Sequence, residues 1–392
     1  MRRALVACIA LTSCGVLGNG SLAQPATLDL SRWTLTKMDV DFVGSPTALC
    51  PGDTLQLSIV AELRHRERDK TRTAQTYEGN RPGLGGRGKL GFDAFTVLSS
   101  QGVVGEHGWF ATNPDPFASL DGFTIEVQHR GAEPLTQTLA YKPRYDCVRQ
   151  GGGAGVSGSA GMPGAEGGAG DRGSYGGSSS DGGAGGDGAG GGSGSAGTAG
   201  GAGPSLVAWA TVVQTRHHPH LVLLEFQGDV TGRVMFDSRD TFVLTAAGGP
   251  GGRGGNGGDG GDGGDGGGGA QGGPGGNGGP GGAGAMGGSG GAGGRITLHI
   301  DERFPELAQH IRLDVSGGAG GFGGVGGQGG RAGRGGHASA EGASDARAPD
   351  GSEGAAGPDG ASGPDGPPGT ADVLVGSVDD RFGSLPEGVE RL

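Results

Sequence analysis

The chain has 392 residues, of which 99 are glycine and only 5% are aromatic, and its net charge at pH 7 is −12. This composition leaves roughly half of the chain for the packed cores of ordinary domains. Most acidic residues follow Gln150, which argues against nucleic acid as a partner, because phosphate binding needs a basic surface. No later stretch approaches the ~20 apolar residues of a membrane span.

The N-terminus predicts export. Arg2 and Arg3 precede an apolar segment, residues 4–11, and a small-residue cleavage site ends at Ala23, so residues 1–23 are expected to be a signal peptide. A second interpretation uses the sequence Leu-Thr-Ser-Cys at 11–14, which resembles the bacterial lipoprotein box and would make Cys14 the lipidated first residue. Either route places the protein outside the cell, secreted or on the outer cell surface.

Cleavage after residue 23 leaves two cysteines, Cys50 and Cys147. Two cysteines in an exported chain most simply form one disulfide. The bond would close a long loop and contribute about 4–5 kcal/mol by the chain-entropy estimate. Two free thiols are the alternative.

Residues 25–150 predict short antiparallel strands. Apolar side chains alternate strictly from Leu55 to Leu63, as in a half-buried strand, and shorter apolar runs follow between turn signals. Strands at this spacing favour a β-sandwich. The sequence Cys-Pro-Gly-Asp at 50–53, with a second cysteine near the end of the region, resembles the immunoglobulin-like modules of exported surface proteins over residues 28–148.

A mixed run of charges occupies residues 64–72 of this domain. Such a run is usually a solvated loop or strand edge. The alternative is a patch that binds a polyanionic glycan. Its basic side chains are Arg64, Arg66, Arg68, Lys70 and Arg72.

The rest of the chain alternates between glycine-rich and β-rich sequence. The glycine-rich regions are 151–204, 248–294 and the partly collagen-like 317–369, and the β regions are 205–247, 295–316 and a terminal strand and tail at 370–392. In 248–294 glycine occupies every third position without exception. A period of three is typical of the polyproline II helix, which rises about 3.1 Å per residue. A flexible glycine/serine linker has no reason to keep such a frame.

Each glycine-rich region leaves a strand and returns to a strand. If each runs out and back, its half-length is about 25 residues, or roughly 75 Å. The predicted fold is therefore mostly β: an immunoglobulin-like antiparallel sandwich, then a second β region carrying three polyglycine or polyproline II excursions. Ordering glycine costs more backbone entropy than ordering any other residue, so disordered glycine-rich regions remain the alternative.

The Gly-Gly-X runs, such as 254–265 and 317–328, resemble snow-flea-type antifreeze proteins and the glycine-rich domains of mycobacterial PE-PGRS surface proteins. The resemblance implies an extracellular structural or interaction role, or ice binding. Ice binding favours a flat face of small residues, whereas the third positions of the central run carry proline, arginine, asparagine, aspartate and glutamine. The structural role is therefore the expectation.

Three aspartates, Asp259, Asp262 and Asp265, recur with the same period. Their predicted spacing of about 9 Å is too wide for one calcium ion, whose oxygen ligands lie at roughly 2.3–2.6 Å. A solvent-facing ladder is the better interpretation.

Two further motifs carry little chemistry. His217, His218 and His220 surround a proline, which predicts a turn with exposed histidines rather than a metal site. Ser289 fits a Gly-x-Ser-x-Gly pattern, but no strand-turn-helix context surrounds it. The sequence thus predicts no catalytic, cofactor or metal-binding residue.

These observations favour a non-enzymatic, exported structural or adhesive protein of the cell surface, with no cofactor and built on a glycine-triplet bundle. The alternative is a module that binds a cell-surface glycan or matrix protein through the sandwich domain, with flexible glycine-rich spacers.

Overall fold

The structure is a computed structural model that describes residues 28–76, 90–105, 108–131, 134–339 and 346–392. The predicted signal peptide, 1–23, and Cys14 lie outside the described residues. The chain forms two compact units. The first comprises the described residues within 1–46, 54–111 and 124–140, and the second comprises 47–53, 112–123 and 141–392.

The first unit is built from antiparallel strands, and β3 (Thr54–His65) is its central element. β3 pairs with β1, β4 and β7, and its side chains alternate between buried and exposed, with Leu57, Ile59 and Leu63 almost fully buried. A separate sheet has the order β2-β9-β8-β5, in which β2 (Ala48–Leu49) belongs to the second unit and pairs with β9 in parallel. The other elements of this part of the chain are η1 (Leu30–Arg32), β1 (Trp33–Phe42), β4 (Thr71–Gln75), η2 (Phe92–Ala94), β5 (Phe95–Leu98), β6 (Gly102–Val104), β7 (Trp109–Thr112), β8 (Phe123–His129) and β9 (Thr136–Pro143), and η4 (Pro116–Ser119) lies within the second unit.

The second unit contains two sheets that bury alternate side chains against each other. Phe242, Leu244 and Ala246 of one sheet share a core with Ile296 and Leu298 of the other. The three-stranded sheet is parallel and contains β10 (Gln150–Ala154), β14 (Phe242–Ala247) and β16 (Ile311–Asp314). The six-stranded sheet contains β11 (Ser205–Thr215), β12 (Leu221–Gly228), β13 (Gly232–Asp237), β15 (Arg295–Asp301), β17 (Thr370–Gly376) and β18 (Val389–Arg391). Two short helices, α1 (Leu307–His310) and α2 (Asp379–Phe382), complete the unit.

The predicted mostly β fold with antiparallel sheets is confirmed. The border between the units differs from the predicted end of the first domain at residue 150. Residues 112–123 and 141–150 belong to the second unit, because Phe117, Leu120 and Tyr145 pack against Leu221, Leu223 and Met235 of the six-stranded sheet.

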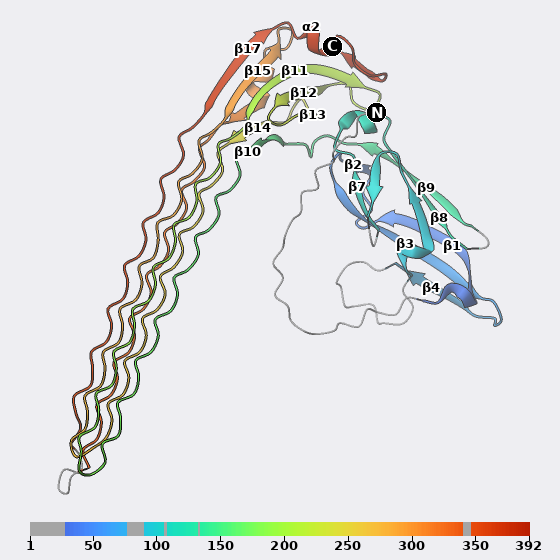
Figure 1. Cartoon of the computed structure of the whole chain (residues 1–392). Helices are drawn as coiled ribbons and strands as arrows, with labels where there is room; N and C mark the ends of the chain where they lie inside the picture. Colours follow the sequence, from blue (N-terminus) through green and yellow to red (C-terminus); the bar gives the residue numbers. More distant parts are fainter. Residues whose placement is uncertain (1–27, 77–89, 106–107, 132–133, 340–345) are drawn as a thin grey trace, which may run out of the picture. The chain divides into compact units, whose positions relative to one another are not determined.

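The two packed sheets of the second unit, which we call the second sandwich, continue directly into the glycine-rich sequence (Figure 1). Each strand of the three-stranded sheet runs into a segment that leads away from the second sandwich, and a second segment returns to a strand of the six-stranded sheet. We name these segments T1 to T6. T1 (155–176) and T2 (182–203) connect β10 to β11, T3 (248–267) and T4 (273–294) connect β14 to β15, and T5 (317–336) and T6 (351–369) connect β16 to β17.

Backbone hydrogen bonds join the six segments at every third residue. T1, T3 and T5 form one parallel layer, in which the Gly254 N–H donates to the Phe322 carbonyl at 2.9 Å. T2, T4 and T6 form a second parallel layer. The layers are joined in antiparallel fashion, for example by the Gly261 N–H, which donates to the Ala189 carbonyl at 2.8 Å. T3 and T4 therefore have four neighbours each, whereas T1 and T6 have two.

The number of neighbours explains the number of glycines in a triplet. A Cβ added to Gly260 would lie 2.0 Å from the Gly279 carbonyl oxygen, and one added to Gly261 would lie 2.0 Å from the Gly168 oxygen. Two positions of each T3 triplet thus face a neighbouring backbone, and both are glycine. The outermost segment T1 needs one glycine in a triplet, and Gly168, which points away from the other segments, has no atom within 4 Å of its added Cβ.

Cys50 and Cys147 lie at disulfide distance, with their Cα atoms 6.5 Å apart. The pair is therefore placed to form the predicted bond. It would join Cys50, directly after β2, to Cys147, four residues after β9, close to the Leu49–Pro143 pairing of these two strands.

Gly261→Ala should destabilise the protein by about 1–3 kcal/mol, because the new methyl group overlaps the Gly168 carbonyl and the segments must move apart. Gly168→Ala is the matched control. It should be neutral or stabilising by up to about 1 kcal/mol, since it restricts the unfolded chain without a clash. Urea unfolding of both variants measures the difference. Equal effects would contradict the close packing of T1 against T3.

Candidate functional site

The two layers of segments expose different side chains. The third residues of the T3 and T5 triplets form a face that is rich in charge, which we call the charged face. Its exposed residues are Pro250, Arg253, Asn256, Asp259, Asp262 and Asp265 on T3, and Ala319, Phe322, Val325, Gln328, Arg331 and Arg334 on T5. Acidic and basic residues of neighbouring segments lie side by side here, so the face has mixed sign.

The three aspartates of the predicted ladder have a defined role on the charged face. The Oδ1 atoms of Asp259, Asp262 and Asp265 accept the backbone N–H groups of Gln328, Arg331 and Arg334 at 2.7–2.8 Å. The carboxylates are exposed, as the sequence predicts, but they also satisfy amides of the neighbouring segment that point away from the layers. No local pattern in the sequence indicates this role, because each partner lies 69 residues away.

Part of the opposite layer carries small or uncharged side chains. We call the area formed by the third positions within 190–202, 280–292 and 355–367 the small-residue face. Its residues are Gly190, Ser193, Ala196, Ala199 and Ala202 on T2, Pro280, Ala283, Met286, Ser289 and Ala292 on T4, and Ala355, Pro358, Ala361, Pro364 and Pro367 on T6. Their carbonyls on T4 and T6 accept N–H groups from the adjacent segment of the same layer, which keeps the three rows in register.

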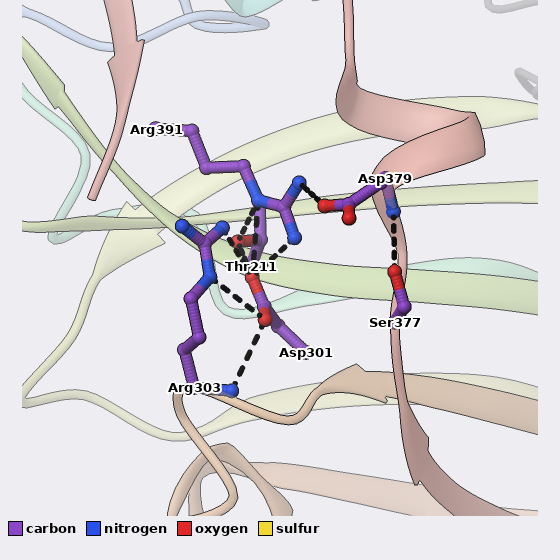
Figure 2. A network of polar contacts seen from close by, with 6 residues as sticks. All are labelled: Thr211, Asp301, Arg303, Ser377, Asp379 and Arg391. Carbon is purple, nitrogen blue, oxygen red and sulfur yellow. Dashed lines mark hydrogen bonds and ion pairs between the residues drawn. The ribbon is translucent and has the colours of Figure 1, made fainter.

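A buried carboxylate, Asp301, anchors the C-terminal segment to the six-stranded sheet (Figure 2). Asp301 ends β15, and its side chain is 1% exposed. It accepts the Thr211 hydroxyl at 2.5 Å, the Arg303 Nη2 at 2.9 Å and the Arg391 Nη2 at 2.8 Å. Arg391 also pairs with Asp379 of α2. One carboxylate therefore holds β11, β15 and β18 together.

The same contacts determine the pKa of Asp301. Burial by itself would raise the pKa, but the hydrogen bonds from Arg303, Thr211 and Arg391 outweigh burial and hold the pKa well below its usual value. The carboxylate is thus ionised at neutral pH, and its oxygens are occupied by donors. This arrangement suits a structural anchor, because no lone pair is directed at an open site.

A second buried carboxylate repeats the arrangement on β12. Glu225 pairs with Arg233 of β13 at 2.5 Å and with Arg381 of α2 at 2.7 Å. The Arg381 guanidinium also lies over the Trp209 ring, 4.9 Å from its centroid. Glu225 and Asp301 therefore hold the C-terminal segment, residues 377–392, at Arg381 and Arg391. Phe382 and other apolar side chains of this segment pack into a core cluster of the second unit.

The predicted ligand patch lies on the first unit, at the turn between β3 and β4. Arg64, Arg66, Arg68 and Lys70 are exposed, and Arg72 is partly buried. Glu67 and Asp69 are exposed within the same turn, so the basic side chains outnumber the acidic ones without forming a purely basic surface.

The histidine motif at 217–220 and Ser289 make contacts that do not involve each other. The His218 Nε2 lies 3.0 Å from the Pro143 carbonyl, and its ring contacts Tyr145 edge-on, while His220 is exposed. The Ser289 carbonyl accepts the N–H of Gly200 within the T2–T4 pairing. Among the described residues, no group of three histidine, cysteine, aspartate or glutamate side chains could hold a metal ion.

The part of the chain that the structure describes contains no helix that is both long enough and apolar enough to cross a membrane. No protein-family model, curated protein or solved structure matches the chain.

Arg391→Ala should lower the free energy of unfolding by about 3–5 kcal/mol at pH 7, because it leaves a buried carboxylate without one of its cations. The lowered pKa of Asp301 means that its stabilisation is complete above the unfolded value near 3.8 and is lost as the pH falls through the lower folded value. The cost of the substitution should therefore shrink below about pH 4, as urea unfolding across pH would show.

The control is Arg239→Ala, which removes a pair with Asp237 in which the arginine is 86% exposed. Its cost should be much smaller than that of Arg391→Ala, because solvent screens an exposed ion pair. An equal cost for both variants, or a cost for Arg391→Ala that does not depend on pH, would contradict the role of Asp301 as an anchor.

Proposed function

We propose that this chain is a non-enzymatic, exported structural or adhesive protein of the cell surface, in which T1 to T6 are polyglycine II helices packed into a rigid bundle. The observation that carries the proposal is the hydrogen-bond network that joins all six segments with a period of three. A flexible spacer has no need for such a network, whereas an element that holds surfaces at a fixed distance does.

The network offsets part of the entropy cost of ordering glycine. Fixing a residue costs backbone entropy, and each hydrogen bond returns some of that free energy. The T3 glycines donate to neighbours on both sides, and close Cα–carbonyl contacts add to each bond. Each pair of segments (T1 with T2, T3 with T4, T5 with T6) also begins and ends at a strand of the second unit. The two sheets of that unit supply the apolar core that the segments lack.

The dimensions suit a rod-like element. At about 3.1 Å per residue, a segment such as 248–267 would span about 60 Å. The bundle presents the charged face on one layer and, over part of that length, the small-residue face on the other. Such regular surfaces suit extended contacts with a matrix or with neighbouring molecules rather than a pocket for a small substrate.

The proposal includes the finer assignment of the first unit and the cell compartment. An immunoglobulin-like sandwich is supported by the antiparallel strands and the two sheets of that region. Export is supported by the placement of Cys50 and Cys147 at disulfide distance, because disulfides persist in oxidising compartments.

Amide hydrogen exchange on the mature protein tests the rigid bundle. Gly257 and Gly258 donate to the Val325 and Gly192 carbonyls and should be protected, while the amide of Asp259, which has no backbone acceptor among the described residues, should exchange faster. The expected pattern is therefore protection with a period of three. Uniform exchange at free-peptide rates would contradict the proposal.

Labelling of intact cells tests the surface location. A membrane-impermeant maleimide should label a Ser193→Cys variant on the cells that produce the protein, because Ser193 is exposed on T2. Labelling only after lysis would contradict a location on the cell surface.

A second candidate function is glycan binding by the first unit. The exposed basic side chains at the β3–β4 turn favour it, because they gather four cations within residues 64–70. In this case the bundle would serve as a spacer that carries the binding domain.

Immobilised heparin should retain the mature protein at low salt if this second function is correct, and retention should fall steeply as salt screens the charges. The triple variant Arg66→Ala, Arg68→Ala, Lys70→Ala should lose retention, whereas the control Arg331→Ala, Arg334→Ala on the charged face should keep it. Equal retention of both variants would exclude the β3–β4 turn as the glycan site.

A further inference from the structure

The six-stranded sheet ends at β17 with an exposed apolar edge. Val373, Leu374 and Val375 are 47%, 48% and 55% exposed, and the preceding residues of the strand are exposed as well. β17 pairs with β15 on one side, and no described strand pairs with its other side. Exposed, apolar edge strands are sites at which further strands add.

Two other edge strands of the second unit, β13 and β16, are protected. On β13, Arg233 pairs with Glu225 and Asp115 and covers the Phe117 ring, with its guanidinium 4.0 Å from the ring centroid. The edge strand β16 has only four residues, and Arg312 and Asp314 lie within it. β17 has seven residues, and its one charged side chain, Asp372, is paired with Arg295.

The hydrogen bonds of β17 show which of its backbone groups face outward. The Thr370 N–H donates to the Gly294 carbonyl, and the Gly376 carbonyl accepts the Glu302 N–H. Thr370 and Gly376 therefore direct their polar groups toward β15 and its extension. Because this direction alternates along a strand, Leu374 also faces β15, while Val373 and Val375 face outward with backbone groups available for a new strand.

We propose that β17 pairs with β17 of a second copy of this chain, in antiparallel orientation about a two-fold axis at Leu374. This register places Leu374 opposite Leu374 of the partner, and Val373 opposite Val375. The two valines of each such pair would exchange both backbone hydrogen bonds, which matches the outward direction of their polar groups. The interface is self-complementary, as a two-fold dimer requires.

Charge selects this register over its neighbours. With the axis at Leu374, Asp372 lies opposite Gly376, which has no side chain and leaves the Asp372–Arg295 pair undisturbed. An axis at Asp372 would place two carboxylates opposite each other, which is unfavourable. An axis at Val373 would place Asp372 opposite Leu374. Pairing at Leu374 alone sets the three apolar residues entirely against apolar residues.

Sedimentation velocity of the mature protein tests the pairing. The native protein should form a dimer that is lost in Leu374→Lys, because the axis places the two lysines opposite each other. The matched control is Val325→Lys, at an apolar residue of similar exposure, 52%, on T5, and it should remain dimeric. A native protein that sediments as a monomer at every concentration, or a Leu374→Lys variant that stays dimeric, would overturn the proposal.

Cysteine cross-linking tests the register and does not rely on a destabilising substitution. Directly opposed residues of antiparallel strands have Cα atoms roughly 4.5–5.5 Å apart, within the range of a disulfide. Leu374→Cys should form a covalent dimer under mild oxidation, whereas Val373→Cys should not, because its partner position is Val375. Cross-linking of Val373→Cys without cross-linking of Leu374→Cys, or of neither variant, would overturn the proposed axis.

Discussion

The separation between neighbouring glycine-rich segments is set by direct contact between a glycine Cα and a carbonyl oxygen of the next segment. A Cβ at Gly261 or Gly279 would lie about 2 Å from such an oxygen, so no side chain larger than hydrogen fits. This one constraint shapes the repeat: segments with four neighbours carry two glycines in every triplet except 284–286 of T4, where Ala285 replaces the second glycine, and segments with two neighbours need one. It also directs the remaining residue of each triplet outward, which creates the charged face and the small-residue face.

The two sheets of the second unit supply the apolar core that the glycine-rich segments lack. A glycine triplet buries little apolar surface, so the free energy that holds both ends of each pair of segments must come from the core between these sheets. Phe236 and Phe242 stack across these sheets with ring centroids 5.0 Å apart. Asp301 then ties the C-terminal segment to the six-stranded sheet, which T2, T4 and T6 enter at β11, β15 and β17. The order of β11, β15 and β17 in that sheet is also the order of the segments in their layer.

The sequence predicts the parts of this structure that have a local cause. Alternation in β3 predicts a half-buried strand, and the glycine frame is visible because each triplet repeats the same environment. The sequence does not show which segments are neighbours. Gly261, for example, contacts only backbone atoms of the next segment, and such a contact does not depend on the type of residue there. The hydrogen bond from the Arg331 N–H to Asp262 joins residues 69 positions apart, and the pairing of Asp301 with Arg391 joins residues 90 positions apart. No short sequence motif reveals either contact. The unit border is hidden for the same reason, because Tyr145 is placed by distant apolar partners.

The most direct test of the central claim is the scalar coupling across a backbone hydrogen bond, measured by NMR on labelled mature protein. The coupling between the Gly261 amide nitrogen and the Ala189 carbonyl carbon reports a single bond between T3 and T2, and that between Gly279 and Gly261 reports the bond from T4 to T3. We expect both couplings to be present, with further couplings at every third residue along the segments. Absence of both couplings, with glycine chemical shifts at random-coil values, would contradict a bundle held together by its backbone.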